Sequence, residues 1–234
     1  MKTLIKCDAL LAAALVMSVA IVLAQPCVAR AGTIPCREVY GSTGGYVCGA
    51  DVDSRLFDLA FAPAQTQTGC WAVSMAMIIA YSGGEISQND ILSSVFGASV
   101  PPTLALSQAI GDSTRSFTGA NHAVVETSAS VLFSTPLKGS RGELRTIAGQ
   151  LQEDTPLLVF TSHNAMLLTR IYYHADLFGH PTSLYAAVVR DPFPQTGPPV
   201  TTGVKIDGYP GQRFLTQAEY NDIQSVVQVS VKNH

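Results

Sequence analysis

The decisive stretch of this chain reads Gln65-Thr-Gln-Thr-Gly-Cys70-Trp71, and it opens an apolar run that ends at Tyr81. The glycine pair Gly83-Gly84 follows, and glycine commonly ends a helix. We therefore expect a helix over 69–81 with Cys70 in its first turn. The positive end of a helix dipole favours a thiolate, so the pattern predicts a nucleophile with a lowered pKa. The alternative is a buried structural cysteine.

The N-terminus has the layout of a secretory signal peptide. Lys2 and Lys6 precede an almost wholly apolar stretch from Ala9 to Ala24, which at about 16 residues is short for a membrane span. Small residues permit cleavage after Ala24 or after Ala31. We expect residues 1–31 to be a signal peptide, residues 32–234 to form a single domain, and the product to be secreted or periplasmic.

The mature chain is acidic and has no basic cluster. Removal of residues 1–31 leaves eleven Lys and Arg against sixteen Asp and Glu, a formal charge of −5. Nucleic acid and anionic membrane surfaces are therefore not expected as partners. His174 and His180 flank Asp176 without a third ligand spaced for zinc, and the glycine-rich stretches lack a phosphate-loop lysine. We expect no cofactor and no metal.

Three cysteines remain after cleavage at Ala31. Cys36 and Cys48 flank the turn-rich stretch 41–45, so they are the natural disulfide pair in an oxidising compartment. Cys70 is then the free thiol. Cleavage after Ala24 would retain Cys27 and weaken this assignment.

Helical patterns come first in the chain and strand patterns second. Helices are expected over 69–81, from Ser87 through Val95, after Pro101-Pro102-Thr103, and after the capping box Ser140-Arg-Gly-Glu143. Possible strands at 122–126 and 130–134 precede clearer ones at 157–161, 165–173, 184–190 and 223–231, with a short helix capped by Thr216 between the last two. This segregation predicts an α+β fold, with an N-terminal helical half packed on a C-terminal, mostly antiparallel sheet.

A cysteine nucleophile needs a base, usually histidine, and an acceptor that orients it. His163 lies between the strands expected at 157–161 and 165–173, and Asp191 ends the later strand in Val188-Val-Arg-Asp191-Pro192. Gln65 would donate its side-chain NH2 to the oxyanion that develops during the reaction, and Gln67 is the alternative donor. His122, in Asn121-His-Ala-Val-Val, is the alternative base.

These motifs resemble the papain-like cysteine peptidase superfamily over about residues 60–200. Gln65 through Cys70-Trp71-Ala72 is similar to the family's oxyanion and nucleophile segment, and Ser87-Gln88-Asn89-Asp90-Ile91 to its "S-Q-x-x-I" segment. His163-Asn-Ala-Met-Leu-Leu-Thr resembles "G-H-A-V-V-L-T-G", and Val188-Val-Arg-Asp191-Pro192 resembles "V-x-D-P". The short bacterial members related to staphopains and bacteriocin-processing peptidases are the most similar.

The resemblance implies a papain-like fold and hydrolysis of peptide bonds in a protein or peptide substrate. Cys70 would be the nucleophile, His163 the acid and base, Asp191 the orienting group and Gln65 the oxyanion donor. Departures are Ser162 and Arg170 at usual glycine positions and an inserted hairpin tip between Tyr173 and Ser183. An amide transferase, a deamidase, or a non-catalytic secreted binding module with the same fold are the alternatives.

Overall fold

The structure is a computed structural model that describes residues 32–38, 45–64, 69–96, 113–119, 122–134, 139–193 and 207–233. The described residues belong to one compact unit, Ala31–His234. The expected signal peptide and the short helix expected after Pro101 lie outside the described residues.

Strands outnumber helices in the described chain. The strands are β1 (Gly32–Glu38), β2 (Tyr46–Asp51), β3 (Ser113–Thr118), β4 (Val124–Ser134), β5 (Leu157–Thr161), β6 (Ala165–Ala175), β7 (Pro181–Arg190), β8 (Gln212–Phe214) and β9 (Ile223–Asn233). The helices are the 3-10 helix η1 (Ser54–Leu59) and the α-helices α2 (Cys70–Tyr81), α3 (Gln88–Phe96), α5 (Arg141–Gln152) and α6 (Gln217–Asn221).

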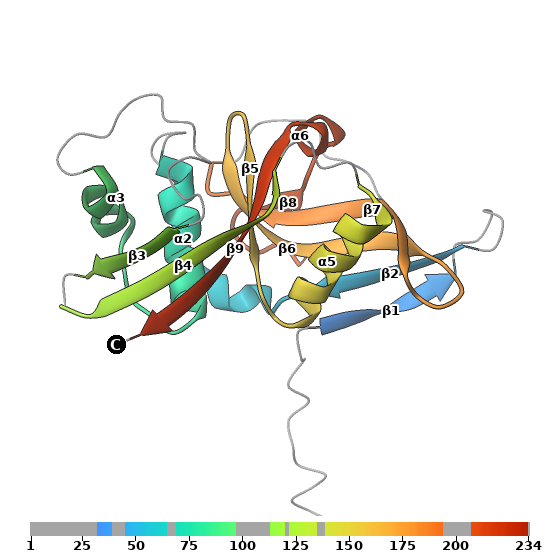
Figure 1. Cartoon of the computed structure of the whole chain (residues 1–234), viewed down its shortest axis with the longest axis horizontal. Coiled ribbons are helices and arrows are strands. Elements are labelled where there is room, and N and C mark those ends of the chain that lie inside the picture. Colours follow the sequence, from blue (N-terminus) through green and yellow to red (C-terminus); the bar gives the residue numbers. More distant parts are fainter. Residues whose placement is uncertain are drawn as a thin grey trace, which may run out of the picture. The chain divides into compact units, whose positions relative to one another are not determined.

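All nine strands join one antiparallel sheet (Figure 1). Its main order is β1-β2-β6-β5-β9-β4-β3, and β7 with β8 branches from β6. The long strand β6 pairs with β2 and β5 along one side and with β7 along the other. This central strand therefore links the N-terminal hairpin to the C-terminal strands.

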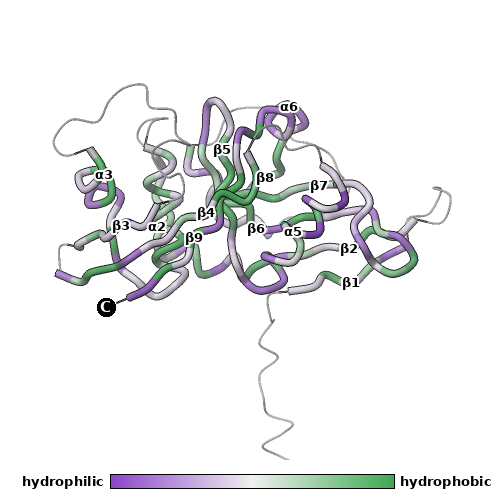
Figure 2. The backbone as a smooth tube through the Cα atoms, in the orientation of Figure 1, coloured by the Kyte–Doolittle hydropathy of each residue, from purple (hydrophilic) through white to green (hydrophobic). Residues whose placement is uncertain are grey.

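Helix α2 is buried along nearly its whole length. Every residue from Cys70 to Ile79 is buried, as expected for a helix that is apolar all round. The helix ends at Tyr81 as the glycine pair predicts, and Gly83 adopts a φ of 83°, which glycine accepts without strain. Figure 2 shows a hydrophobic concentration where the paired strands β5 and β9 lie.

The predicted fold class is wrong. The N-terminal part does not form a helical half, because β1 and β2 begin the described chain and β3 and β4 follow α3. Strands from both halves enter the same sheet, which is mostly antiparallel. Buried positions of β4 include Thr127 and Ala129, so its sequence lacks the strongly apolar alternation that reveals a strand.

Several local predictions are confirmed. The disulfide joins Cys36 to Cys48, which is consistent with export to an oxidising compartment. Ser140 and Thr216 each form a capping box, at α5 and α6. The insert between Tyr173 and Ser183 is the turn of the β6–β7 hairpin. None of the helices in the described part of the chain has the length and apolar character needed to cross a membrane.

Candidate active site

Cys70 begins helix α2 and is completely buried. Its sulfur accepts a hydrogen bond of 3.1 Å from the Ala165 amide at the start of β6. One helical turn further on, the Ser74 hydroxyl donates to the Ala165 carbonyl over 3.2 Å. Both backbone groups of Ala165 are thus tied to the first turns of α2, which fixes the helix against the sheet.

Asn164, rather than a histidine, lies next to this contact and reaches Asp191. The Asn164 side-chain oxygen accepts from the Ala165 amide at 2.9 Å, the same N–H that faces the sulfur. Its side-chain NH2 donates to Asp191 over 2.8 Å. The structure therefore places the side-chain amide of Asn164 between the Cys70 sulfur and the Asp191 carboxylate.

Asp191 is fully buried and accepts hydrogen bonds on both oxygens. One oxygen receives the amides of Asn164 and Phe193, each at 2.8 Å, and the other receives two N–H groups of Arg213 at 2.7 and 2.8 Å. Arg213 also pairs with Glu219, the glutamate of the α6 capping box. We call Cys70, Asn164, Asp191 and Arg213 the thiol site.

Burial, with a smaller contribution from the nearby Asp191 charge, raises the pKa of Cys70 to about 11. The Ala165 N–H and the N–H groups at the helix start act in the opposite direction but do not outweigh desolvation. The lowered pKa expected from the helix start is therefore wrong. A thiol with this pKa is almost wholly protonated at neutral pH and is a poor nucleophile.

His163 is exposed, whereas Asn164 is only 2% exposed. It lies near the carboxylate of Asp222, whose pKa is lowered chiefly by the Ser162 hydroxyl and to a smaller degree by His163. Thr161 holds the turn, since its hydroxyl accepts from the amides of His163 and Asn164. The Ser162 amide and hydroxyl both donate to Asp222.

The other candidate residues lie apart from the thiol site or outside the described chain. Gln65 and Gln67 fall outside the described residues. His122 is exposed on the turn between β3 and β4, where its amide donates to Gly119. No group of three or more His, Cys, Asp and Glu side chains suited to a metal ion occurs among the described residues.

The sequence reasoning missed Asn164, although the motif contained the signal. In "G-H-A-V-V-L-T-G" the histidine directly precedes alanine. Four residues, the last of them threonine, then separate this alanine from the final glycine. If Ala165 and Thr169 are matched to the motif, Arg170 takes the final glycine position and Asn164 takes the histidine position. His163 then falls on the first glycine.

Comparison with known protein families, with curated proteins and with solved structures gives no match. The assignment of a function therefore depends on the geometry of the chain itself.

Proposed function

We propose that this protein is an exported, non-catalytic binding module that retains the sequence segments of a papain-like cysteine peptidase. The observation that carries the proposal is Asn164, which occupies the position between the buried thiol and Asp191. An amide has no basic nitrogen at neutral pH, so Asn164 cannot take the thiol proton.

The surrounding contacts favour a structural role for these residues. The sulfur accepts a backbone N–H, the Asn164 side chain is bonded through both its oxygen and its nitrogen, and Asp191 is held by Arg213. A buried polar group that is fully hydrogen-bonded contributes to a unique packed arrangement.

A cysteine peptidase that uses His163 is the second candidate. The observation in its favour is the carboxylate of Asp222 near His163, because catalytic histidines are commonly oriented by a carboxylate. This mechanism requires the His163 imidazole to reach the buried Cys70 sulfur. A deamidase or an amide transferase would need the same contact.

The test compares wild type, Asn164→His and His163→Ala in the mature protein. We expect wild type and His163→Ala to show no cleavage of a peptide library and equal, slow alkylation of Cys70 by iodoacetamide at pH 7. Asn164→His places an imidazole in the middle position, and a general base typically contributes about 10²–10⁴-fold to rate, so its alkylation should be at least about tenfold faster.

Cys70→Ser serves as the control for cleavage by a contaminating peptidase. Peptide hydrolysis by wild type that is lost in both Cys70→Ser and His163→Ala would overturn the proposal and establish the second candidate. Because Asn164 is buried, thermal unfolding of Asn164→His is measured alongside, and the His163→Ala comparison remains decisive if that variant fails to fold.

A further inference from the structure

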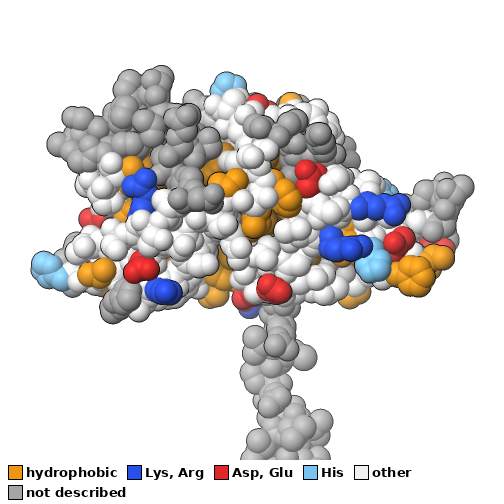
Figure 3. Space-filling model, viewed as in Figure 1, with side chains coloured by type: hydrophobic (Ala, Val, Ile, Leu, Met, Phe, Trp, Pro, Cys, Tyr) orange, Lys and Arg blue, Asp and Glu red, His pale blue; other side chains and the backbone are white. Residues whose placement is uncertain are grey.

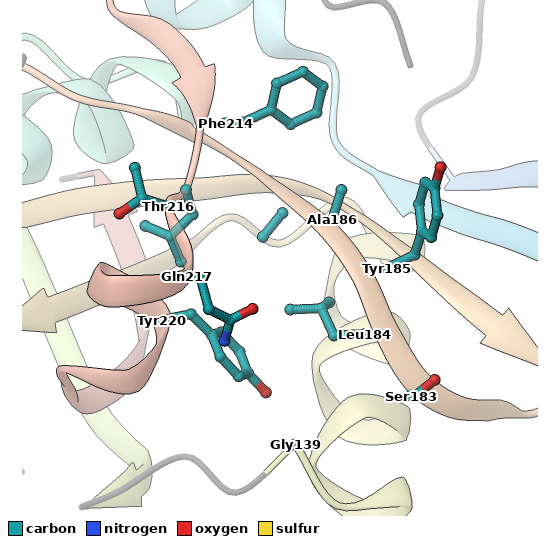
Figure 4. Close-up of a pocket in the computed structure, with 11 residues that line it drawn as sticks. Gly139, Ser183, Leu184, Tyr185, Ala186, Phe214, Thr216, Gln217 and Tyr220 are labelled. Carbon is teal, nitrogen blue, oxygen red and sulfur yellow. The ribbon is translucent and has the colours of Figure 1, made fainter. Parts of the chain in front are cut away.

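A pocket of about 330 Å³ lies between strand β7 and helix α6. Figure 4 shows Leu184 from β7 and Gln217 and Tyr220 from α6 directed into the same space. Sites for small molecules typically have volumes of about 300–1,000 Å³ and a mixed lining of apolar and polar groups. The pocket therefore has the size and the lining of a site for a small ligand.

A second cavity, of about 20 Å³, adjoins the pocket on the side of helix α5. The two cavities have four lining residues in common, which are Leu184, Ala187, Leu215 and Tyr220. The other residues around the smaller cavity are all aliphatic, and Leu144 and Ile147 of α5 are among them. An apolar void suits a methyl group better than a water molecule, which needs polar partners. A branched hydrocarbon group on a ligand could therefore extend from the pocket toward the core.

The lining also restricts the charge of a ligand. None of the described residues around the pocket has a charged side chain. An ion would lose part of its hydration there without gaining an ionic partner, which is unfavourable. The pocket therefore favours an uncharged ligand.

The Tyr220 hydroxyl is a donor that a ligand could satisfy. It is buried and has no hydrogen-bond partner among the described residues, and Figure 4 shows it directed toward Gly139. A Cβ at residue 139 would lie 2.5 Å from this oxygen, so glycine keeps the space beside the hydroxyl open. Since Gly139 also lines the pocket, a small displacement of this residue would admit a carbonyl oxygen to the hydroxyl.

Gln217 offers the complementary acceptor. Its side-chain NH2 donates to Asn221 over 3.0 Å within α6, so its carbonyl oxygen is the group that it can offer to a ligand. The neighbouring Thr216 hydroxyl is already used in the capping box of α6. A ligand with both a C=O and an N–H group could thus pair with Tyr220 and Gln217. A secondary amide has these two groups.

We propose that this pocket binds an uncharged secondary amide that has a branched aliphatic side chain. The ligand carbonyl accepts from the Tyr220 hydroxyl, and the ligand N–H donates to the Gln217 carbonyl. The aliphatic group lies against Leu184 and Leu215, next to the smaller cavity. The inference rests on the proposed binding role of the protein and adds to it a site and a class of ligand.

NMR titration of the methyl-labelled mature protein with N-acetyl-L-leucine N-methylamide tests the proposal. We expect saturable shifts of the Leu184, Ala187 and Leu215 methyl signals, with a dissociation constant of about 1 mM or lower for a ligand of this size. N-acetylglycine N-methylamide lacks the aliphatic group and should bind at least about tenfold more weakly. N-acetyl-L-leucine, which is an anion at neutral pH, should also bind at least about tenfold more weakly.

Two substitutions test the assigned contacts. Tyr220→Phe removes only the hydroxyl and should raise the dissociation constant by about threefold to tenfold, because one hydrogen bond is lost. Leu184→Trp fills the pocket and should abolish the shifts. Tyr46→Phe, which alters a 37% exposed tyrosine on β2, is the matched control and should bind the amide as wild type does.

Thermal unfolding of each variant is measured alongside. Tyr220→Phe should be at least as stable as wild type, since the hydroxyl has no partner to lose among the described residues, and its comparison remains decisive if Leu184→Trp fails to fold.

Wild type that shows no saturable shifts up to about twenty times the expected dissociation constant would overturn the proposal. Equal affinities for the leucine and glycine amides would overturn it as well, and so would binding that is unchanged in Tyr220→Phe. None of these results alters the outcome of the peptide-library test, which depends on Cys70 and His163. A failure of this inference is therefore distinguishable from a failure of the proposed function.

Discussion

The thiol site and the turn of the β6–β7 hairpin (residues 176–180, the hairpin tip) are opposite in character. At the thiol site, Cys70 and Asp191 are completely buried, and the polar groups of Asn164 are bonded on every side. At the tip, a rigid turn holds Leu177 and Phe178 almost fully in solvent, and Figure 3 shows hydrophobic side chains gathered at the end of the molecule where this hairpin lies. The segment that resembles a catalytic centre thus has the contacts of a structural core, while the inserted hairpin has the exposure of a binding element.

The largest expected effect of a single substitution is at the buried carboxylate. Asp191→Ala leaves Arg213 and the Asn164 amide without their acceptor, and breaking a buried pair typically costs about 3–5 kcal/mol. Urea denaturation measures this loss. Glu153→Gln, an exposed carboxylate at the end of α5, should change stability by less than about 0.5 kcal/mol. Equal effects would contradict the structural role of the thiol site.

The disulfide should contribute somewhat less to the free energy of unfolding than the buried carboxylate does. Cys36→Ser/Cys48→Ser opens a loop with a sequence separation of 12, and the chain-entropy account gives about 2–3 kcal/mol for a loop of this size. Guanidinium unfolding of the oxidised wild type and the double variant measures the difference. A stability unchanged by reduction would show that β1 and β2 are held by the sheet alone.

A single hydrogen bond beneath the thiol site should have a smaller effect. Ser74→Ala removes the buried hydroxyl that donates to the Ala165 carbonyl, and such a bond contributes about 1 kcal/mol. Equilibrium urea unfolding provides the value. An unfolding free energy that does not change would indicate that apolar packing alone fixes α2 and that this hydrogen bond does not contribute.

The smallest effect on folding is expected at the tip. Leu177→Ser/Phe178→Ser should change the unfolding free energy of the monomer by less than about 0.5 kcal/mol, because these side chains are exposed. Urea denaturation of the wild type and the double variant measures the change. A loss of several kcal/mol would mean that the tip supports the fold and would remove the contrast with the thiol site.

Sequence patterns located the helices and the apolar strands but not the architecture. Helix α5 and strand β5 were predictable because a capping box or an unbroken apolar run defines them. The strand at 124–134 was predicted only as two possible short strands at 122–126 and 130–134, because Thr127 and Ala129 occupy inward positions between them. The sheet joins distant segments such as β2 and β6, a pairing that local periodicity does not contain.

Within the site, the sequence located Cys70 and Asp191 in the same neighbourhood but misplaced the residue between them. Histidine is the usual partner of a catalytic cysteine, so the sequence pattern favoured His163. An asparagine such as Asn164 is not by itself indicative of a catalytic site. The side-chain direction at such a turn depends on the hydrogen bonds that the backbone amides donate to Thr161, which become visible only in the structure.

The ionisation of Cys70 tests the central claim most directly. Thiolate absorbance is followed against pH in native wild type, with Cys70→Ser subtracted as the blank and His163→Ala measured in parallel. Desolvation predicts an apparent pKa of about 11 that is the same in wild type and His163→Ala, so that almost no thiolate exists at neutral pH. A thiolate already present at pH 7 and lost in His163→Ala would establish a Cys70–His163 pair and contradict the account of a non-catalytic thiol site.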